Sequence, residues 1–417
     1  MDLADRLWRG EASTAVHHPV VYSGDLCEVA DGVAFLPTFA NASAFTTEDG
    51  LFMVDTGSGF TARRLFDETR RWSSQRLNTA VFSHGHIDHV FGVALFDEES
   101  TREGWPSPRV VAHRHVPRRF DRYVLTAGYN QVINRRQFGL DQLVWPTTYR
   151  YPDQTYASEL DVDVGGLEVR LRHEKGETDD ATVTWVPSHR ALCTGDLFVW
   201  SSPNAGNPQK VQRYPREWAQ ALRRMAELDA ELLLPGHGLP VVGAQRIRQA
   251  LTETATYLES LVDQTLAMMN SGARLSDVLA SVRPPAELAD RPFLQPVYDE
   301  PEFIVRNIWR LYGGWWDGNP ANLQPASDRR LAVELADLAG GPTRLARRAE
   351  ALSDAGEDVD LRLAGHLAEL AWLAAPGDLD VAATRQRVFT RRAEAASSTM
   401  ARGVFTWAAR ESEPIVD

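Results

Sequence analysis

The chain has 417 residues, of which 43% are hydrophobic and 24% charged, and its formal net charge is −13 at pH 7. This length exceeds what one hydrophobic core usually serves, so we expect two domains. The acidic balance argues against a nucleic-acid partner, because phosphate binding needs a basic face. No apolar run approaches the roughly 20 residues that span a membrane, and the first residues do not resemble a signal peptide, so we expect a cytoplasmic protein.

The N-terminal part of the chain alternates two kinds of pattern. Short runs rich in valine, leucine and phenylalanine predict strands, and they alternate with stretches of helical periodicity such as residues 60–72 and 216–228. This alternation is typical of a layered α/β protein. We therefore expect an α/β domain over residues 1–251, in which the strand before each polar loop positions the side chains of that loop.

Strand signals fade after Leu251, where alanine, leucine, arginine and glutamate recur at helical spacing. The clearest helical segments are residues 331–338, 343–352 and 361–373. Breaks between helices are marked by Pro284-Pro285, by Asn319-Pro320 and by Ala375-Pro376-Gly377-Asp378. Residues 252–417 are thus expected to form an all-helical domain.

A cluster of histidines follows the apolar run Thr79 to Phe82, in the sequence Ser83-His84-Gly85-His86-Ile87-Asp88-His89. A strand ending at Phe82 would leave His84 and His86 on a turn, where both imidazoles can share a metal ion. Asp88 and His89 would then open the following helix. Nitrogen and oxygen ligands this close suit zinc, and a carboxylate between imidazoles lets a second ion lie beside the first. The spacing H-x-H-x-D-H is too restrictive for an ordinary histidine-rich surface loop.

This run resembles the metal-binding motif of the metallo-β-lactamase fold. Val54-Asp55-Thr56-Gly57, upstream of it, is similar to the strand-to-turn element of that fold. The resemblance implies an αββα sandwich in which further metal ligands come from separate later loops.

Three later segments match those loops. In Gly176-Glu177-Thr178 the glutamate stands where most members of the fold carry a histidine, so Glu177 would replace the third imidazole, and His173 is its rival. Asp196, in the run Leu192 to Phe198, matches a bridging carboxylate, and His237, in Leu233 to Gly238, matches the final histidine. Each segment alone is weak evidence, because such glycine pairs are usually turns. Because the three segments follow the first motif in the order expected of the fold, together they are strong evidence.

The resemblance implies a dinuclear zinc centre. The first ion would be bound by His84, His86 and Glu177 and the second by Asp88, His89 and His237, with Asp196 and a hydroxide between them. Two such ions lower the pKa of a bound water to about 7 and polarise the substrate oxygen, so Asp88 and Asp196 are expected at the catalytic centre of a hydrolase. Iron or manganese would also suit mixed histidine and carboxylate ligands.

The second half of the chain resembles alkylsulfatases, which hydrolyse alkyl sulfate esters. Residues 261–272 and 312–320 are similar to the dimerisation domain of that family, and residues 128–136 resemble an inserted segment of the same group. The resemblance implies a homodimer formed through the helical domain, which could also act as a lid over the metals. The chain ends at Asp417, so we expect it to lack the sterol-carrier-like domain of long alkylsulfatases.

Two departures from the alkylsulfatase pattern concern the substrate. The bridging residue of that family is usually glutamate, whereas this chain has Asp196, and the family arginine that holds the sulfate would fall near Asn207. A His-Asn pair of the family falls on Phe303-Ile304. The side chains that could bind the substrate instead are Asn204, Lys210, Arg213 and Arg135.

The leading hypothesis is a hydrolase in which metal-bound hydroxide cleaves a small-molecule ester of an apolar group, first of all an alkyl sulfate ester. A carboxyl ester, lactone or thioester hydrolase is the alternative, and the unmatched arginine favours it. A non-catalytic dimer scaffold stabilised by metals is an alternative of another class. Loss of a ligand would favour the scaffold, and this sequence retains every ligand of the motif.

Overall fold

The computed structural model describes residues 2–19 and 21–413. The chain divides into two compact units, one of residues 1–127 and 145–315 and the other of residues 128–144 and 316–417. Each unit is described by itself. Among the described residues, no helix combines the length and the apolar character needed to cross a membrane.

The first unit contains a seven-stranded sheet whose strands follow one another in chain order. Strands β1 to β4 pair antiparallel, and β4 to β7 pair parallel. The strands are β1 (Cys27–Ala30), β2 (Val33–Leu36), β3 (Ala42–Thr47), β4 (Gly50–Val54), β5 (Leu77–Val81), β6 (Arg109–His113) and β7 (Gln154–Tyr156).

A second sheet of six strands has the order β13-β12-β11-β10-β9-β8, and only the β11–β12 pair is parallel. Every residue of β11 and β12 is buried, whereas β8 and β9 alternate between buried and exposed residues, as strands with one solvated face do. The strands are β8 (Glu159–Val164), β9 (Leu167–Glu174), β10 (Ala181–Val186), β11 (Ala191–Val199), β12 (Leu232–His237) and β13 (Val241–Val242).

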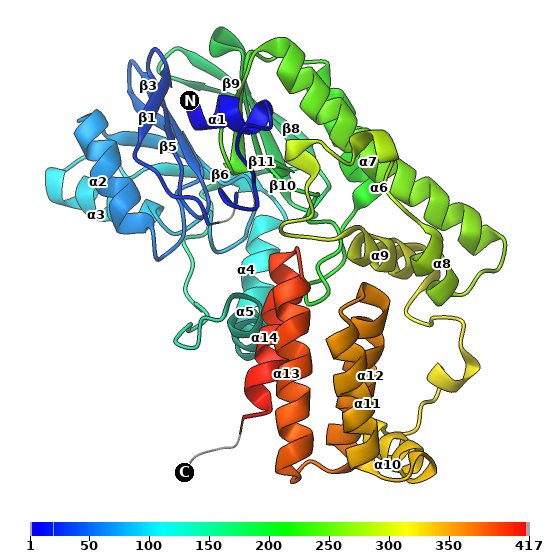
Figure 1. Ribbon diagram of the computed structural model, residues 1–417. Coiled ribbons are helices and arrows are strands. Elements are labelled where there is room, and N and C mark those ends of the chain that lie inside the picture. Colours follow the sequence, from blue (N-terminus) through cyan, green and yellow to red (C-terminus); the bar gives the residue numbers. More distant parts are fainter. Residues whose placement is uncertain (1, 20, 414–417) are drawn as a thin grey trace. The chain divides into compact units, whose positions relative to one another are not determined.

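Helices cover the outer faces of the two sheets (Figure 1). The helices of this unit are α1 (Asp2–Trp8), α2 (Ala62–Trp72), α3 (Val93–Glu103), α4 (Val116–Leu125), α6 (Pro215–Ala226), α7 (Ala244–Asn270), α8 (Leu275–Ser281) and α9 (Pro301–Gly313). Short 3₁₀ turns lie at Pro187–His189, Ala286–Leu288 and Pro292–Leu294. The helical stretches expected at 60–72 and 216–228 correspond to α2 and α6, which confirms those predictions.

Three hydrophobic clusters define the layers of this unit. One joins residues of both sheets, such as Phe35 and Val81 of the first and Val169 and Leu234 of the second. Another packs α2, α3 and α4 on the first sheet, and the third packs α6 and α7 on the second. The order helix, sheet, sheet, helix confirms the expected αββα sandwich.

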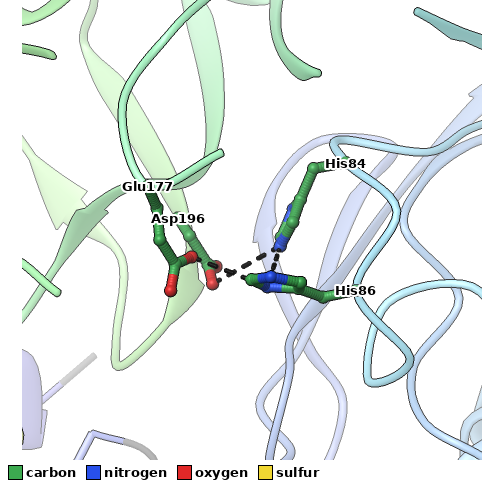
Figure 2. Close-up of side chains that lie close together, drawn as sticks. All are labelled: His84, His86, Glu177 and Asp196. Atoms are coloured by element: carbon green, nitrogen blue, oxygen red, sulfur yellow. Dashed lines mark hydrogen bonds and ion pairs between the residues drawn. The ribbon is translucent and has the colours of Figure 1, made fainter. Parts of the chain in front are cut away.

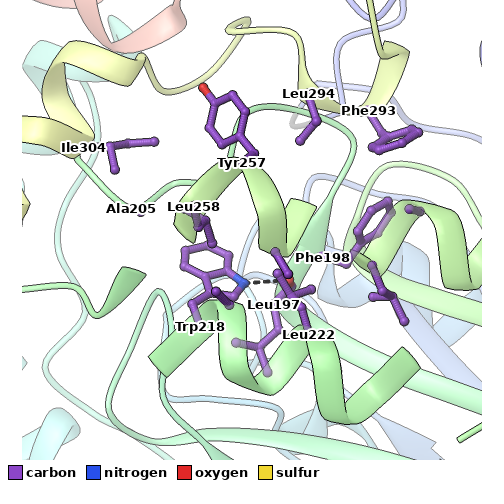
Figure 3. Close-up of a cluster of buried hydrophobic side chains, with 14 of the residues drawn as sticks. Leu197, Phe198, Ala205, Trp218, Leu222, Tyr257, Leu258, Phe293, Leu294 and Ile304 are labelled. Carbon is purple, nitrogen blue, oxygen red and sulfur yellow. Dashed lines mark hydrogen bonds between the residues drawn. The ribbon is translucent and has the colours of Figure 1, made fainter. Parts of the chain in front are cut away.

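The third cluster also includes α9 and the segment before it. Trp218 of α6 is completely buried, and its Nε1 donates to the carbonyl of Leu197 at 2.7 Å. Figure 3 shows this ring beside Leu258 of α7, with Ile304 of α9 elsewhere in the same cluster. The domain boundary expected between residues 251 and 252 falls inside α7, and the first compact unit continues to residue 315. The assignment of catalysis to one region and dimerisation to the other stays a prediction.

The second unit is helical. It contains most of α5 (Ala127–Phe138) together with a 3₁₀ turn at Pro320–Asn322 and the helices α10 (Asp328–Ala339), α11 (Pro342–Ala355), α12 (Asp358–Ala374), α13 (Leu379–Ala395) and α14 (Thr399–Glu411). The expected helical segments lie in α10, α11 and α12, and the expected breaks lie between helices. Arg385 of α13 ties this unit together, because its Nε donates to Glu369 of α12 at 2.8 Å and its Nη1 to the carbonyl of Ala408 of α14 at 2.7 Å.

Candidate metal centre

The histidine motif lies in the loop between β5 and α3. Asp55, at the end of β4, holds the start of this loop: its Oδ1 accepts from the backbone N–H of Ser83 and its Oδ2 from the Ser83 hydroxyl, both at 2.7 Å. Asp55 has a φ of 61°, in the left-handed region that non-glycine residues rarely adopt. The strained turn after β4 thus places a carboxylate beneath the motif.

The expectation that Asp88 and His89 open the following helix is wrong. Both residues lie in a turn, and α3 begins only at Val93. The carbonyl of His89 accepts from the backbone N–H of Thr56 at 2.7 Å and from its hydroxyl at 3.2 Å. Because this carbonyl bonds to the loop after β4, it is not available to a helical turn.

A first group of candidate ligands consists of His84, His86, Glu177 and Asp196 (Figure 2). One ligand atom from each lies within 4.8 Å of those of the others. His84 Nε2 lies 2.8 Å from His86 Nδ1 and 3.7 Å from Asp196 Oδ2, and His86 Nδ1 lies 3.7 Å from Glu177 Oε2. His84 and His86 follow β5 of the first sheet, whereas Glu177 follows β9 and Asp196 lies in β11 of the second, so each sheet contributes to this group.

A second group consists of Asp88, His89 and His237, again with ligand atoms within 4.8 Å of one another. Asp88 Oδ2 lies 3.6 Å from His89 Nε2 and 3.5 Å from His237 Nε2. Asp196 also reaches this group, with Oδ1 3.5 Å from His89 Nε2 and Oδ2 3.3 Å from His237 Nε2. Asp196 therefore lies between the two groups, where a carboxylate can contact two cations.

The outward ring nitrogens of three histidines are engaged by other groups. His89 Nδ1 lies 2.8 Å from Asp55 Oδ2, His84 Nδ1 lies 3.0 Å from the Ser83 hydroxyl, and His237 Nδ1 donates to the carbonyl of Phe39. These contacts leave Nε2 of each ring facing the cluster. Such a hydrogen bond on the far nitrogen is the usual way in which proteins orient a metal-binding imidazole.

The donor set fits divalent cations. Three buried atoms at the centre, His89 Nε2, Glu177 Oε2 and Asp196 Oδ1, have no hydrogen-bond partner among the described residues. Leaving buried polar atoms unsatisfied is costly, and nitrogen and carboxylate oxygen atoms are the ligands that zinc and similar ions prefer. The structure therefore brings all the predicted ligands together at a site suited to two ions, and their individual roles as ligands stay a prediction.

Burial and neighbouring charges shift the pKa values of the groups at this centre in different directions. Burial lowers the pKa of His84 to about 4, so its Nε2 lone pair is available at neutral pH. Burial raises the pKa of Glu177 to about 8, although Arg213 opposes that shift. Burial also disfavours charge on His89, but the carboxylates of Asp196 and Asp55 outweigh it and raise the pKa of His89 well above its ordinary value. Bound cations would displace protons from Glu177 and His89.

Two buried residues that the sequence analysis missed hold the H-x-H turn. Arg119 of α4 donates from Nε to Asp180 Oδ2 at 2.6 Å and from Nη2 to Oδ1 at 2.9 Å. Asp180 Oδ2 in turn accepts from the backbone N–H of Gly85 at 3.3 Å. The position of Asp180 shortly after Glu177 was a signal for this role, whereas Arg119 carries none in its own surroundings.

Asn41 holds the His237 loop and was missed as well. Its Nδ2 donates to the carbonyls of Pro235 at 3.0 Å and Gly238 at 2.8 Å, and its backbone N–H donates to Gly236 at 2.8 Å. Phe39, two residues earlier, accepts from His237 Nδ1. The short segment before β3 thus orients the last candidate ligand.

His173, the rival of Glu177, belongs to neither of the two groups that the described residues form. Its Nε2 lies 3.0 Å from the carbonyl of Asp179, and its ring stacks on His113 with the centroids 3.7 Å apart. His115 Nδ1 lies 3.1 Å from the same carbonyl. These three imidazoles contact backbone and one another beside the centre.

The four predicted substrate-binding residues fall in different places. Asn204 Nδ2 donates to Glu177 Oε1, and Arg213 Nη1 forms an ion pair with the same oxygen. Lys210 is half-buried with its Nζ 5.9 Å from the centre of the Trp145 ring, and burial lowers its pKa to about 7, with Arg213 adding to the shift. Arg135 lies in the second compact unit, where its Nε donates to the carbonyl of Leu143 at 2.8 Å.

Comparison with known proteins finds two family matches in the chain. Residues 36–237 match the metallo-beta-lactamase superfamily, and residues 274–414 match the alkyl sulfatase dimerisation family. A linear primary-alkylsulfatase from Pseudomonas sp. is 28% identical over 320 residues, which cover 70% of this chain and 59% of that protein. An (R)-specific secondary-alkylsulfatase from Pseudomonas sp. is 24% identical over 375 residues, covering 82% of this chain and 55% of that protein.

A solved structure shares the fold over most of the chain. The stereoselective inverting sec-alkylsulfatase Pisa1 from Pseudomonas sp. superposes with a TM-score of 0.84 at 22% identity, over 94% of this chain and 66% of that one. The chain thus spans a little more than half the length of the curated relatives it matches. The chain combines a region that matches the metallo-β-lactamase superfamily with one that matches the alkyl sulfatase dimerisation family. This combination is consistent with a protein of the alkylsulfatase type.

The ligand assignment can be tested by removing one carboxylate and one rival imidazole. Glu177→Gln should lower the metal occupancy of the first ligand group, because the amide cannot provide an anionic ligand. His173→Ala should leave the metal content unchanged, because this ring contacts only the surroundings of the centre. Metal analysis of the purified variants measures both, and equal occupancy after the glutamate change would show that the loop is wrongly assigned.

Proposed function

We propose that this protein is a dinuclear, zinc-dependent hydrolase that cleaves alkyl sulfate esters. The observation that carries the proposal is the pair of adjacent ligand groups that share Asp196, in a chain of the alkylsulfatase type. Two divalent ions bound there would activate a water molecule as the nucleophile and polarise the ester oxygen. Iron or manganese would satisfy the same ligands.

The residues of the chain would hold both ions and determine the net charge that a substrate meets. His84, His86 and Glu177 would hold one ion, and Asp88, His89 and His237 the other, with Asp196 between them. Three carboxylates and a hydroxide would balance the charge of two divalent cations, so the centre would be formally neutral and an anionic substrate would need a further cation from the chain.

Lys210 is the cation proposed to hold the sulfate. Arg213 is ion-paired with Glu177, and the acidic groups that raise the pKa of Lys210, Asp88 and Glu177, both belong to the centre. The chain has only two lysines, Lys175 and Lys210, and its other basic residues are arginines. Lys210 is therefore an exception among the positively charged side chains of this protein. An ammonium group can turn towards a bound anion without the fixed plane of a guanidinium.

Hydrolysis of a carboxyl ester, lactone or thioester is the second candidate. The engagement of Arg213 by Glu177 favours it, because that arginine is then not available for a sulfate group. Both candidates use the same metal ligands and differ in whether a cation is needed for the substrate.

Turnover of dodecyl sulfate beside a neutral aryl ester and a lactone separates the two candidates. We expect the metal-loaded protein to release sulfate, and a chelator to abolish the reaction. Turnover of the neutral substrates alone would establish a metallo-esterase or lactonase instead. Metal content is counted on the same sample, so that an inactive preparation without metal is not taken as evidence.

The role of Lys210 predicts a selective effect of its removal. Lys210→Ala should raise KM for dodecyl sulfate about tenfold, equivalent to about 1.4 kcal/mol of binding, because a charge-assisted contact is lost. KM for the neutral ester should stay the same, and Lys210→Arg should keep most of the sulfate affinity. Steady-state kinetics on both substrates checks this, and an equal rise in both KM values would rule out an anion-binding lysine.

We also propose a homodimer formed through the second unit. The matched dimerisation region includes α10, on which Leu331, Leu335 and Leu338 are 49%, 37% and 77% exposed. Their spacing places them on one face of the helix, beside the face that buries Ala332 and Ala336. An apolar stripe exposed on a helix is typical of a surface that another chain covers.

Charge introduced into this stripe should weaken the dimer. Leu331→Glu combined with Leu335→Glu should shift the protein from dimer to monomer, because two carboxylates would be buried in the interface. Leu379→Glu is the matched control, since Leu379 is 67% exposed and lies on α13. Analytical ultracentrifugation measures the mass, and a dimer that survives the double substitution would exclude α10 from the interface.

A further inference from the structure

The two carboxylate oxygens of Glu177 have different surroundings. Oε1 accepts from Asn204 Nδ2 and forms an ion pair with Arg213 Nη1. Oε2 is buried, has no hydrogen-bond partner among the described residues and lies 3.7 Å from His86 Nδ1. Glu177, Asn204 and Arg213 are all more than nine-tenths buried. Two donors thus occupy one oxygen and leave the other directed at the first ligand group.

Arg213 is itself held at its guanidinium group and at its backbone carbonyl. Its Nη1 donates to the carbonyl of Asn204 at 2.8 Å and its own carbonyl accepts from Asn307 Nδ2 at 3.0 Å. Asn307 also accepts at Oδ1 from Gln212 Nε2, at 3.0 Å. Asn307 lies on α9, so this helix holds the backbone carbonyl of Arg213 and the side chain of the neighbouring Gln212.

The loop that carries Asn204 is anchored to the same helix. The backbone N–H of Gly206 donates to the buried Asp299 at 2.6 Å, and Asp299 also accepts from the N–H of Glu300 at 2.8 Å, just before α9 begins. A Cβ at Gly206 would lie 2.3 Å from the backbone of Phe303 and Ile304. Only glycine permits this close approach, so the loop and the start of α9 are locked together.

We propose that Asn204 and Arg213 are positioning residues that hold Glu177 as a one-oxygen ligand of the first metal site, and that Asn307 fixes Arg213. The inference rests on the proposed dinuclear centre. A carboxylate can bind a cation through either oxygen or both, and it carries a charge that an imidazole lacks. The two donors settle which oxygen is left for the cation, and Arg213 supplies the counter-charge that a buried glutamate requires.

Helix α9 would then support the metal centre, although it lies in the region that matches the dimerisation family. Asn307 lies within residues 274–414, which match the dimerisation family, yet α9 belongs to the first compact unit and packs in its core. Part of that region therefore supports the metal centre. Asn204 and Arg213, which the sequence places among substrate-binding candidates, act here through Glu177.

A double-mutant cycle on zinc affinity tests the inference. Arg213→Met and Asn204→Leu should each lower the affinity for one of the two Zn²⁺ ions by roughly 10- to 100-fold. This is the usual effect of removing a group that orients a metal ligand. The other ion should bind as before. In a Glu177→Ala background, which already lacks the first-site carboxylate, Arg213→Met should have no further effect. Competition with a chromogenic chelator on the purified full chain measures each affinity without reference to activity.

Control variants separate positioning from loss of folding. Arg70→Met removes an ion pair with Glu99, 2.7 Å long, at the α2–α3 contact of the same unit, and should leave both Zn²⁺ affinities unchanged. Arg213→Lys keeps the charge and should restore part of the affinity if the methionine variant is unstable. Asn307→Ala should lower the affinity for the same Zn²⁺ ion as Arg213→Met does, but by a smaller factor. Asn307 contacts Arg213 and does not contact Glu177 itself.

The outcomes distinguish this inference from the proposed function. Unchanged Zn²⁺ affinity in Arg213→Met, together with a higher KM for dodecyl sulfate alone, would overturn the positioning role and return Arg213 to the substrate, while the hydrolase would stand. Non-additive loss of one ion in the cycle supports the positioning role, even if no ester is cleaved. In that last case only the proposed reaction fails.

Discussion

The centre depends on the electrostatic interaction between the carboxylate of Asp196 and the imidazoles around it. The Asp196 oxygens lie 3.3 to 3.7 Å from ring nitrogens of His84, His89 and His237. Burial alone would favour its protonation, but these imidazoles hold the pKa of Asp196 well below its ordinary value. Because the motif follows β5 of the first sheet and Asp196 and His237 lie on β11 and β12 of the second, the charges meet only when the two sheets close on each other.

The hydrophobic sandwich and the polar clamps divide the work of building this site. The cluster between the sheets brings the loops together, but apolar packing has no directionality and does not orient an imidazole. Orientation comes from Asp55, Asn41 and Asp180, which hold the loops of His89, His237 and His84 through directional hydrogen bonds. Each clamp is buried, so its hydrogen bonds are not weakened by competition with water.

Glutamate in place of the commoner imidazole changes what the surroundings must provide. A buried carboxylate needs donors and positive charge, and the loop after β11 supplies both through Asn204 and Arg213. That loop in turn depends on α9 and on Asp299 for its shape. The surroundings of Glu177 thus reach a segment far along the chain, which belongs to the same compact unit.

Local patterns in the sequence were sufficient for the α/β character of the first unit, the helical second unit and the histidine motif, because strand and helix periodicity and the spacing within one motif are properties of neighbouring residues. The αββα layers and the later candidate ligands Glu177, Asp196 and His237 came from the resemblance to a known fold. Local patterns were insufficient for Arg119, Asn41 and Asn307, whose partners Asp180, Pro235 and Arg213 lie 61, 194 and 94 residues away. The turn at Asp88 and His89 belongs to this second class, since the hydrogen bond from Thr56 decides it. Contacts between distant segments exist only once the two sheets have packed, so tertiary structure alone could determine which side chains orient the metal ligands.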